Sequence, residues 1–174
     1  MLGKKRDTPY RVEALGKQHD KEGFTCGSGP LDHYLEVQAG QDTRKRVAAT
    51  FVLCEGESNR VIGFYTLSAI SVDIGAWPES VAKKLPRYPV IPATLLGRLA
   101  IDKQRQGRGA GEHLLMDALH RSWRTAREVA SVAVVVDAKD RRAAEFYTQY
   151  DFTPLVDPPI RLFLPMSVIE KLFS

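Results

Sequence analysis

A turn rich in glycine and arginine is the stretch of this chain whose residue types point most directly to chemistry. It runs from Arg105 to Gly111, between a β-like segment ending at Ile101 and an apolar-periodic run that begins at Leu114. Glycine permits positive φ angles and lets the backbone approach an oxygen atom closely, because no Cβ stands in the way. Backbone N–H groups at a helix start attract anions. The pattern therefore predicts a cradle for a phosphate group.

The spacing of the glycines excludes two common nucleotide-binding motifs. We expect Gly107, Gly109 and Gly111 to supply the open conformations of the turn, with Arg105 and Arg108 adding positive charge. These glycines lack the GxGxxG spacing of a dinucleotide fingerprint, and no Gly-Lys-Ser/Thr follows as in a P-loop. The pattern that fits is Gln106-x-x-Gly109-x-Gly111. Taken alone, the stretch leaves open a glycine-rich turn that binds no ligand.

Composition is that of an ordinary soluble globular protein. The chain has 174 residues, of which 44% are hydrophobic and 26% charged, and its net charge of +4 suits an anionic partner. We find no apolar run of membrane-spanning length and no apolar core after the charged start, so we expect a cytoplasmic protein without a signal peptide. Cys26 and Cys54 do not lie in a metal-ligand spacing with histidines, which predicts reduced, structural thiols and no metal.

Hydrophobic periodicity and turn residues predict alternating strands and helices along the chain. Strands are predicted over residues 9–15, 49–54, 61–68, 95–101 and 132–136, with a terminal pair at Phe152 and 161–164. Helices are predicted for about three turns from Pro30, over 78–85, from Leu114, from a cap at Asp140, and after Pro165. A charged connection at 42–46 and a proline-rich approach at 86–92 join them. The absence of repeats and linkers predicts one domain over residues 1–174.

The glycine turn and this order of elements resemble the GNAT superfamily of N-acetyltransferases. The motif Gln/Arg-x-x-Gly-x-Gly/Ala holds the acyl-CoA pyrophosphate there, and residues 137–140 followed by Ala143-x-x-Phe146-Tyr147 resemble the family's fifth strand end and fourth helix. The resemblance implies an α/β (α+β) GNAT fold, a central mixed, mostly antiparallel sheet with splayed fourth and fifth strands and helices on both faces. It also implies acetyl-CoA as co-substrate and no metal.

The resemblance carries over residue roles. Tyr147 becomes the candidate general acid for the leaving thiol, because a phenol with a pKa near 10 can donate to a thiolate whose thiol pKa is near 8.5. Its spacing alone favours a packing role in the apolar stripe with Phe146 and Tyr150. The implied coenzyme-binding residues are Leu99, Ala100, Ile101, Gln106, Gly107, Arg108, Gly109, Ala110, Gly111, Glu112, Asp140, Ala143 and Phe146.

A narrower likeness involves Leu31-Asp32-x-Tyr34-Leu35 after Cys26-Gly27, then residues 49–52 and 96–102. Together they resemble the acetyltransferase toxins of bacterial type II toxin-antitoxin modules. Those toxins acetylate the amino acid on aminoacyl-tRNA and are neutralised by a small ribbon-helix-helix antitoxin. The resemblance thus implies aminoacyl-tRNA as substrate, that antitoxin as partner, and contact with operator DNA only through the antitoxin complex. Related toxins commonly form homodimers, but the sequence leaves open whether this chain forms a homodimer.

Two residues depart from these patterns. Asp151 stands where the family usually has glycine, so a Cβ must tolerate a left-handed conformation there. Glu36 stands at a position that is often basic in the toxins, which weakens the prediction of nucleic-acid contact at that helix.

The acceptor amine is less well defined by the sequence than the donor. Asp102 and Asp137 lie at strand ends, where they would serve as general base or equally as turn caps. An α-amino group has a pKa near 7.7 to 8.0 and needs little deprotonation, whereas a lysine near 10.4 needs more. Candidate RNA contacts are Arg44, Lys45, Arg46, Lys83, Lys84, Arg87 and Arg98, although charge runs are usually solvated faces.

Two other functions remain open at this point. One is acetylation of a small amine or of a protein amine, and the other is a catalytically idle domain that only binds coenzyme A. The basic surroundings argue against a polyamine acceptor, and the intact glycine turn with Tyr147 argues against an idle domain.

Overall fold

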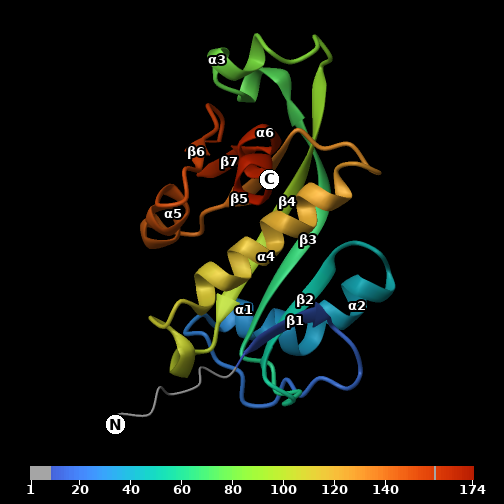
Figure 1. The fold of residues 1–174 in the computed structure, drawn as a ribbon, viewed down its shortest axis with the longest axis vertical. Helices are drawn as coiled ribbons and strands as arrows, with labels where there is room; N and C mark the ends of the chain where they lie inside the picture. The colour runs from blue at the N-terminus through green and yellow to red at the C-terminus, as the bar shows by residue number, and fades with distance from the viewer. Residues whose placement is uncertain (1–8, 159) are drawn as a thin grey trace. The chain divides into compact units, whose positions relative to one another are not determined.

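A computed structural model describes residues 9–158 and 160–174, and within them seven strands form one sheet. The strands are β1 (Tyr10–Ala14), β2 (Ala49–Glu55), β3 (Gly63–Asp73), β4 (Val90–Ile101), β5 (Ala133–Asp137), β6 (Thr153–Pro154) and β7 (Arg161–Pro165). Their order in the sheet is β1-β2-β3-β4-β5-β7-β6 (Figure 1). β4 and β5 are parallel, while β1 with β2, β5 with β7 and β6 with β7 are antiparallel. The predicted mixed, mostly antiparallel sheet is confirmed.

The helices follow the strands in the alternation that the sequence predicts. The α-helices are α1 (Gly29–His33), α2 (Ala39–Arg44), α3 (Glu79–Ala82), α4 (Ala110–Thr125), α5 (Arg141–Thr148) and α6 (Met166–Phe173). A π-helical segment, η1 (Tyr34–Gln38), joins α1 to α2, and short 3-10 helices lie at η2 (Ile74–Ala76) and η3 (Lys103–Arg105).

Contacts divide the chain into two compact units. The first contains the described residues up to Tyr65 together with Leu99–Leu115, and the second contains Thr66–Arg98 with Met116–Ser174. β3, β4 and α4 each continue from one unit into the other along the chain. That residues 1–174 form one domain stays a prediction.

The first unit has a core of aromatic side chains. Phe64 on β3 meets Phe24 edge to face at a centroid distance of 5.7 Å and lies parallel to Tyr34 at 6.2 Å. Leu35 and Ala39 on the helical segment are also buried in this cluster. Apolar residues from α1 to α2 therefore anchor that helical segment on the strands of its unit.

The helical segment that starts at Gly29 is longer than predicted, because the expected charged connection at 42–46 is mostly helical. The Asp42 carboxylate accepts hydrogen bonds from the Tyr34 hydroxyl and the Gln38 amide, both at 2.8 Å. These bonds satisfy the carboxylate of Asp42, a residue type that is common in loops. α2 ends at Arg44, and Arg46, two residues beyond it, has a left-handed φ of 59°. Val47 N–H then donates to the Asp42 carbonyl at 2.9 Å, as in a Schellman motif.

β4 begins earlier than predicted, and Pro92 lies inside the strand rather than in a loop before it. Ile91 and Ala93 on either side of this proline are buried in the core of the second unit. Proline lacks an N–H group, but its carbonyl accepts a hydrogen bond from Val132 N–H at 3.0 Å. The prolines at 86, 89 and 92 thus predict a loop where the alternation of buried and exposed residues shows the start of β4.

The C-terminal elements confirm the sequence predictions closely. Residues 134–136 of β5 are fully buried between β4 and β7, as expected for a central strand. Pro165 precedes α6, and Asp151 has the left-handed φ of 69° that its position demands. The side chain of Trp77 packs edge to face on Phe163 at 5.2 Å in the core of the second unit.

Across residues 9–158 and 160–174, no helix has the length and apolar character needed to cross a membrane. Within the same ranges, no three histidine, cysteine or acidic residues cluster as metal ligands would. Cys26 and Cys54 are not joined in a disulfide, and burial raises the pKa of the Cys54 thiol.

Candidate active site

The glycine turn has the open backbone that a phosphate cradle requires. Gly107 and Gly109 have φ angles of 77° and 80°, in the region that favours glycine. No atom outside the neighbouring residues lies within 4 Å of the place where a Cβ would stand on either glycine. Gly111 differs from the prediction, because α4 begins at Ala110 and places Gly111 in a helical conformation in its first turn. An oxygen atom therefore has room to approach the backbone at Gly107 and Gly109.

The start of α4 supplies hydrogen-bond donors next to these two glycines. His113 N–H donates to the Gly109 carbonyl at 3.0 Å, which makes Gly109 the residue that caps the helix. The N–H groups of the next three residues, Ala110, Gly111 and Glu112, then have no carbonyl one turn earlier to bind. They point along the helix axis, where the dipole favours an anion.

The buried carboxylate of Asp102 fixes the start of this turn by accepting hydrogen bonds. Asp102 has only 4% of its surface exposed, and one of its oxygens accepts a hydrogen bond from Gln104 N–H at 3.0 Å. Its other oxygen accepts from Thr25 N–H at 3.2 Å, while Lys103 N–H donates to the Thr25 carbonyl at 2.8 Å. Asp102 is thus a turn cap that joins two loops, which is the structural role considered for it.

The side chain of Gln106 is also engaged inside the protein. Its Nε2 amide donates to the Ile101 carbonyl at 2.9 Å and to the Cys26 carbonyl at 3.0 Å. The amide therefore fixes the turn between the end of β4 and the loop that precedes α1. Residues 102–112, with these contacts, are called the coenzyme turn below.

The two arginines of the coenzyme turn differ in their surroundings. Arg105 forms a close ion pair with Glu55, and this hydrogen bond raises the pKa of the Arg105 guanidinium. Arg108 is exposed between the two glycines of positive φ. Since Glu55 neutralises much of the Arg105 charge, Arg108 is the better placed of the two to meet a phosphate.

The end of β4 carries the residues expected to meet the pantetheine arm. The ladder between β4 and β5 pairs Thr94–Leu96 with Val134–Val136, and β4 continues as a strand to Ile101. Leu99 is half-buried, whereas Ala100 and Ile101 are buried. The strand therefore runs five residues past its last parallel partner, as a splayed strand must.

The predicted acid, Tyr147, lies on α5 in the second unit. Its side chain is 7% exposed and packs on Phe146 and Phe152 at centroid distances of 5.2 and 5.4 Å. At the start of the same helix, the Asp140 carboxylate accepts the Ala143 N–H at 2.8 Å, which confirms the predicted cap. Asp140 and Ala143 thus bind each other, while the packing of Tyr147 fits both roles considered for it.

Burial raises the pKa of the Tyr147 phenol well above its ordinary value. The group is therefore neutral at any physiological pH and is able to donate a hydrogen bond. It is a weaker acid than a free thiol, whose pKa is near 8.5, so complete proton transfer to a thiolate is uphill in this environment. Stabilising the developing charge on sulfur by hydrogen bonding is the chemistry that this environment favours.

The match to a known family decides the identity of this arrangement. Residues 47–154 match the acetyltransferase (GNAT) domain, which is more than half of the chain. The chain belongs to the GNAT acetyltransferase family. The coenzyme turn lies within the residues that match this family.

Two relatives cover most of this GNAT chain. A tRNA-acetylating toxin of Mycobacterium tuberculosis is 36% identical over 155 residues, spanning 89% of this chain and 91% of its own length. A probable toxin TacT of Sinorhizobium fredii is 29% identical over 164 residues, spanning 90% of this chain and 91% of its own.

Solved structures of GNAT toxins are similar over nearly the whole length. A tyrosine-to-phenylalanine mutant of KacT has a TM-score of 0.89 and 31% identity, covering 94% of this chain and 99% of its own. AtaT complexed with acetyl-methionyl-tRNAfMet has a TM-score of 0.88 and 32% identity, covering 95% and 100%. An AtaT tyrosine-to-phenylalanine mutant bound to acetyl-CoA and the C-terminus of the antitoxin AtaR has a TM-score of 0.80 and 28% identity, covering 95% and 98%.

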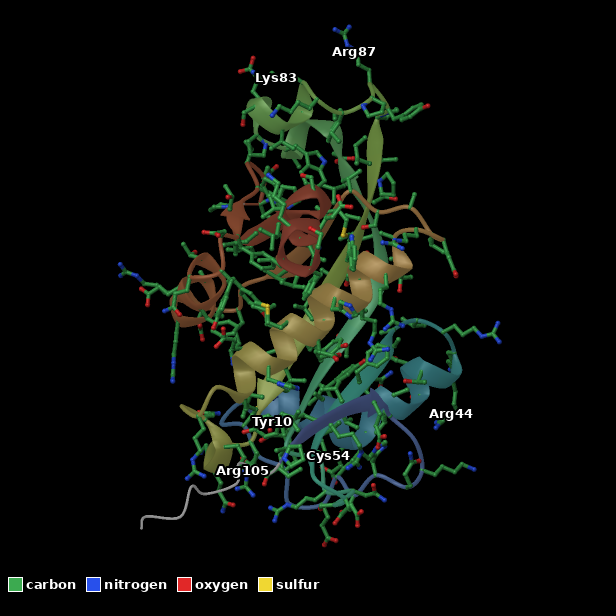
Figure 2. The ribbon with its side chains drawn as sticks, viewed as in Figure 1. Tyr10, Arg44, Cys54, Lys83, Arg87 and Arg105 are labelled. Carbon is green, nitrogen blue, oxygen red and sulfur yellow. The ribbon has the colours of Figure 1, made fainter. Side chains whose placement is uncertain are left out.

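The basic residues considered for RNA contact in this GNAT protein fall into separate places. Arg44, Lys45 and Arg46 are exposed at the end of α2 in the first unit. Figure 2 shows Arg44 there. Lys83, Lys84 and Arg87 are exposed on the segment between α3 and β4, in the second unit. Arg98 is half-buried near the end of β4. Residues 83–90 are called the basic tip below.

Sequence reasoning missed part of the support of the coenzyme turn. Thr25 and Cys26 contribute backbone groups to Asp102 and Gln106, and neither was considered for that purpose. Of these contacts, the sequence indicates only the one between Asp102 and Gln104, because an aspartate that accepts from the N–H two residues later is typical of an Asx turn. The contacts of Thr25 and Cys26 join distant parts of the chain, so no short sequence pattern predicts them.

Proposed function

We propose that this acetyltransferase is a toxin that transfers the acetyl group of acetyl-CoA to the α-amino group of aminoacyl-tRNA and so blocks translation. The observation that carries the proposal is the full-length similarity to AtaT bound to acetyl-methionyl-tRNAfMet, a molecule that is the product of such a reaction. The tRNA-acetylating toxin of Mycobacterium tuberculosis supports the same substrate.

The donor is held by the coenzyme turn in this proposal. The pyrophosphate lies against the N–H groups of residues 107–112, with Arg108 as its cationic partner. The backbone of Leu99, Ala100 and Ile101 binds the pantetheine arm as an added strand. Gln106 acts by fixing the turn, since its amide already binds two carbonyls. Asp140, which caps α5, and Ala143 and Phe146 on α5 complete the set of proposed coenzyme contacts.

The transfer step is a displacement at the thioester carbonyl. The neutral amine nitrogen attacks the carbonyl carbon, an N–C bond forms, and the C–S bond breaks to release coenzyme A. The nitrogen loses one proton to water, and the sulfur receives one. Tyr147 is the proposed donor to the developing thiolate, first through a hydrogen bond, because burial keeps its phenol protonated.

The acceptor amine needs no dedicated base in this scheme. Asp102 is occupied by two backbone N–H groups, and Asp137 accepts a hydrogen bond from Arg161 Nε at 2.7 Å. An α-amino group with a pKa near 7.7 to 8.0 is partly neutral at pH 7, unlike a lysine near 10.4. The α-amine of an aminoacyl ester therefore suits this site better than a lysine side chain.

Partners follow from the proposed function. A ribbon-helix-helix antitoxin neutralises the enzyme, operator DNA is contacted only through that complex, and a homodimer forms. The toxin acts in the cytoplasm, where charged tRNA is present. AtaT bound to the C-terminus of AtaR supports the proposed antitoxin.

Incubation with labelled acetyl-CoA and bulk charged tRNA tests the proposal, beside deacylated tRNA, a polyamine mixture and a lysine-rich peptide. We expect label only on charged tRNA. Label on polyamines or peptide would replace the proposed acceptor with a small or protein amine. Coenzyme binding without transfer to any amine would replace the enzyme with an idle binding domain.

A further inference from the structure

The basic tip carries an exposed tyrosine that no role considered so far uses. Tyr88 has 65% of its surface exposed, although a tyrosine normally buries most of its ring. The core of its unit is built from other residues, including Trp77, Ile91 and Phe163. Tyr88 therefore adds little to folding, and its ring is available to a partner.

The backbone around Tyr88 is held in place. Pro86 and Pro89 restrict φ on both sides of the tyrosine. Tyr88 N–H donates to the Pro86 carbonyl at 2.9 Å, and Ile74 N–H donates to the Pro89 carbonyl at 3.0 Å. Because the backbone is already ordered, a partner that binds the ring loses less conformational entropy than it would on a flexible loop.

The charge around this ring is mainly positive. Lys83, Lys84 and Arg87 are exposed, and Arg87 points outward from the segment between β3 and β4 (Figure 2). Carboxylates on the same excursion are Glu79, in the first turn of α3, and Asp73, at the end of β3. Three cations against these two carboxylates favour an anionic partner, and all three cations lie within five residues of Tyr88 in the sequence.

An exposed aromatic ring among cations matches the chemistry of an unpaired nucleotide. The ring stacks on the base, while lysine and arginine side chains contact the flanking phosphates. We propose that Tyr88 stacks on an unpaired base at the single-stranded 3′ end of tRNA, with Lys83, Lys84 and Arg87 on the neighbouring phosphates. The inference rests on the proposed function, because it assumes tRNA as the substrate.

Binding of deacylated tRNA to the full-length chain tests this inference without any acetyl transfer. The dissociation constant is measured for intact tRNA and for the same tRNA trimmed of its unpaired 3′ nucleotides. Tyr88→Ala should weaken binding of intact tRNA by about tenfold to a hundredfold and leave trimmed tRNA unaffected. Tyr88→Phe, which keeps the ring, should bind within about threefold of the wild type.

Two controls separate stacking from other effects. Val156→Ala alters another exposed apolar residue of the same unit, 61% exposed, and should leave both affinities unchanged. The salt dependence of tRNA binding should be the same for Tyr88→Ala and wild type, because no phosphate contact is lost. An equal loss on intact and trimmed tRNA, or none on intact tRNA, would overturn the inference and favour a protein partner for the basic tip.

The outcome also distinguishes this inference from the proposed function. A chain that binds intact tRNA through Tyr88 but acetylates no charged tRNA would support the inference and contradict the function. A chain that acetylates charged tRNA, with Tyr88→Ala binding as wild type, would overturn the inference alone. A chain that binds no tRNA would overturn both.

Discussion

The coenzyme turn and the basic tip are both expected to bind anions, but they are built in opposite ways. In the coenzyme turn, the Asp102 carboxylate accepts hydrogen bonds from Thr25 and Gln104 N–H. The Gln106 amide donates to the Cys26 and Ile101 carbonyls, and the donors left for a ligand are backbone N–H groups. The basic tip presents Lys84 and Arg87 as exposed side chains. Backbone donors fixed in this way recognise one group of defined shape, whereas exposed cations follow a polyanion with little shape requirement.

This difference predicts two kinds of mutational effect. Changes near the coenzyme turn and Tyr147 should alter catalysis or acetyl-CoA affinity and respond little to salt. Changes in the basic tip should alter RNA affinity in a salt-dependent way and leave acetyl-CoA untouched.

The largest expected effect is that of Tyr147→Phe. Removing the hydroxyl takes away the proposed donor to the leaving thiolate, while the ring still packs on Phe146 and Phe152. We expect kcat to fall by roughly a hundredfold to ten-thousandfold, with acetyl-CoA affinity and melting temperature nearly unchanged. Tyr150→Phe, in the turn that follows the same helix, is the matched control, and a fully active Tyr147→Phe enzyme would remove Tyr147 from the mechanism.

The pH profile should show an acid limb and no alkaline limb below about pH 10. Because the pKa of Tyr147 is raised in the folded protein, its protonated form persists beyond the pH at which a free phenol ionises. The contribution of this pKa difference to the free energy of unfolding is complete below about pH 10, near the pKa of Tyr147 in the unfolded chain. It is lost as the pH rises toward the higher pKa of Tyr147 in the folded protein. A fall in kcat between pH 8 and 9, measured with saturating acetyl-CoA, would contradict this assignment.

Asp102→Asn should loosen the backbone of the coenzyme turn, although the Asp102 side chain is not among the proposed coenzyme contacts. The amide keeps one acceptor oxygen and places an NH2 group against either Thr25 N–H or Gln104 N–H. We expect a loss of about 1 to 3 kcal/mol in the free energy of unfolding. The KM for acetyl-CoA should rise several-fold with less change in kcat. Asp137→Asn, at an exposed ion pair, is the control and should cost about 1 kcal/mol or less.

Lys84→Ala should change the salt dependence of tRNA binding and nothing at the coenzyme. Loss of one phosphate contact lowers the slope of log K against log salt by about 1. The KM for acetyl-CoA should be unchanged. If KM for acetyl-CoA rose and the slope stayed constant, the contrast between the two regions would be wrong.

The smallest expected effect is that of Arg46→Gly. Arg46 has a left-handed φ of 59°, which a glycine adopts without a Cβ clash. The free energy of unfolding should rise by about 0.5 to 1 kcal/mol. If the Arg46 guanidinium contacts a phosphate of tRNA, the variant should also bind tRNA more weakly. Thermal melts and tRNA titrations measure the two effects. A less stable glycine variant would show that the arginine side chain stabilises the helix end.

Local parts of the site could be predicted from the sequence, and distant contacts could not. The open backbone at Gly107 and Gly109 and the cap at Asp140 are encoded by residues next to one another. The bonds from Thr25 to Asp102 and from Gln106 to Cys26 join residues 77 and 80 positions apart. Such contacts depend on the tertiary fold, so short-range patterns do not contain them.

Two misjudged elements show how tertiary contacts override local signals. The sequence predicts a loop at Pro92, yet burial of Ile91 and Ala93 beside it keeps the segment in β4. It predicts a connection at Asp42, yet the hydrogen bonds that Asp42 accepts from Tyr34 and Gln38 keep this residue helical. Residue roles in catalysis and RNA contact stay predictions, since they depend on molecules outside the chain.

Mass spectrometry of nuclease-digested charged tRNA, after incubation with the enzyme and acetyl-CoA, tests the central claim most directly. Digestion releases the 3′-terminal adenosine with its amino acid, and fragmentation locates the acetyl group. We predict N-acetylaminoacyl-adenosine with the acetyl group on the α-nitrogen, absent when Tyr147→Phe replaces the wild type. Unmodified aminoacyl-adenosine, together with acetyl groups on polyamines or protein lysines, would contradict the account.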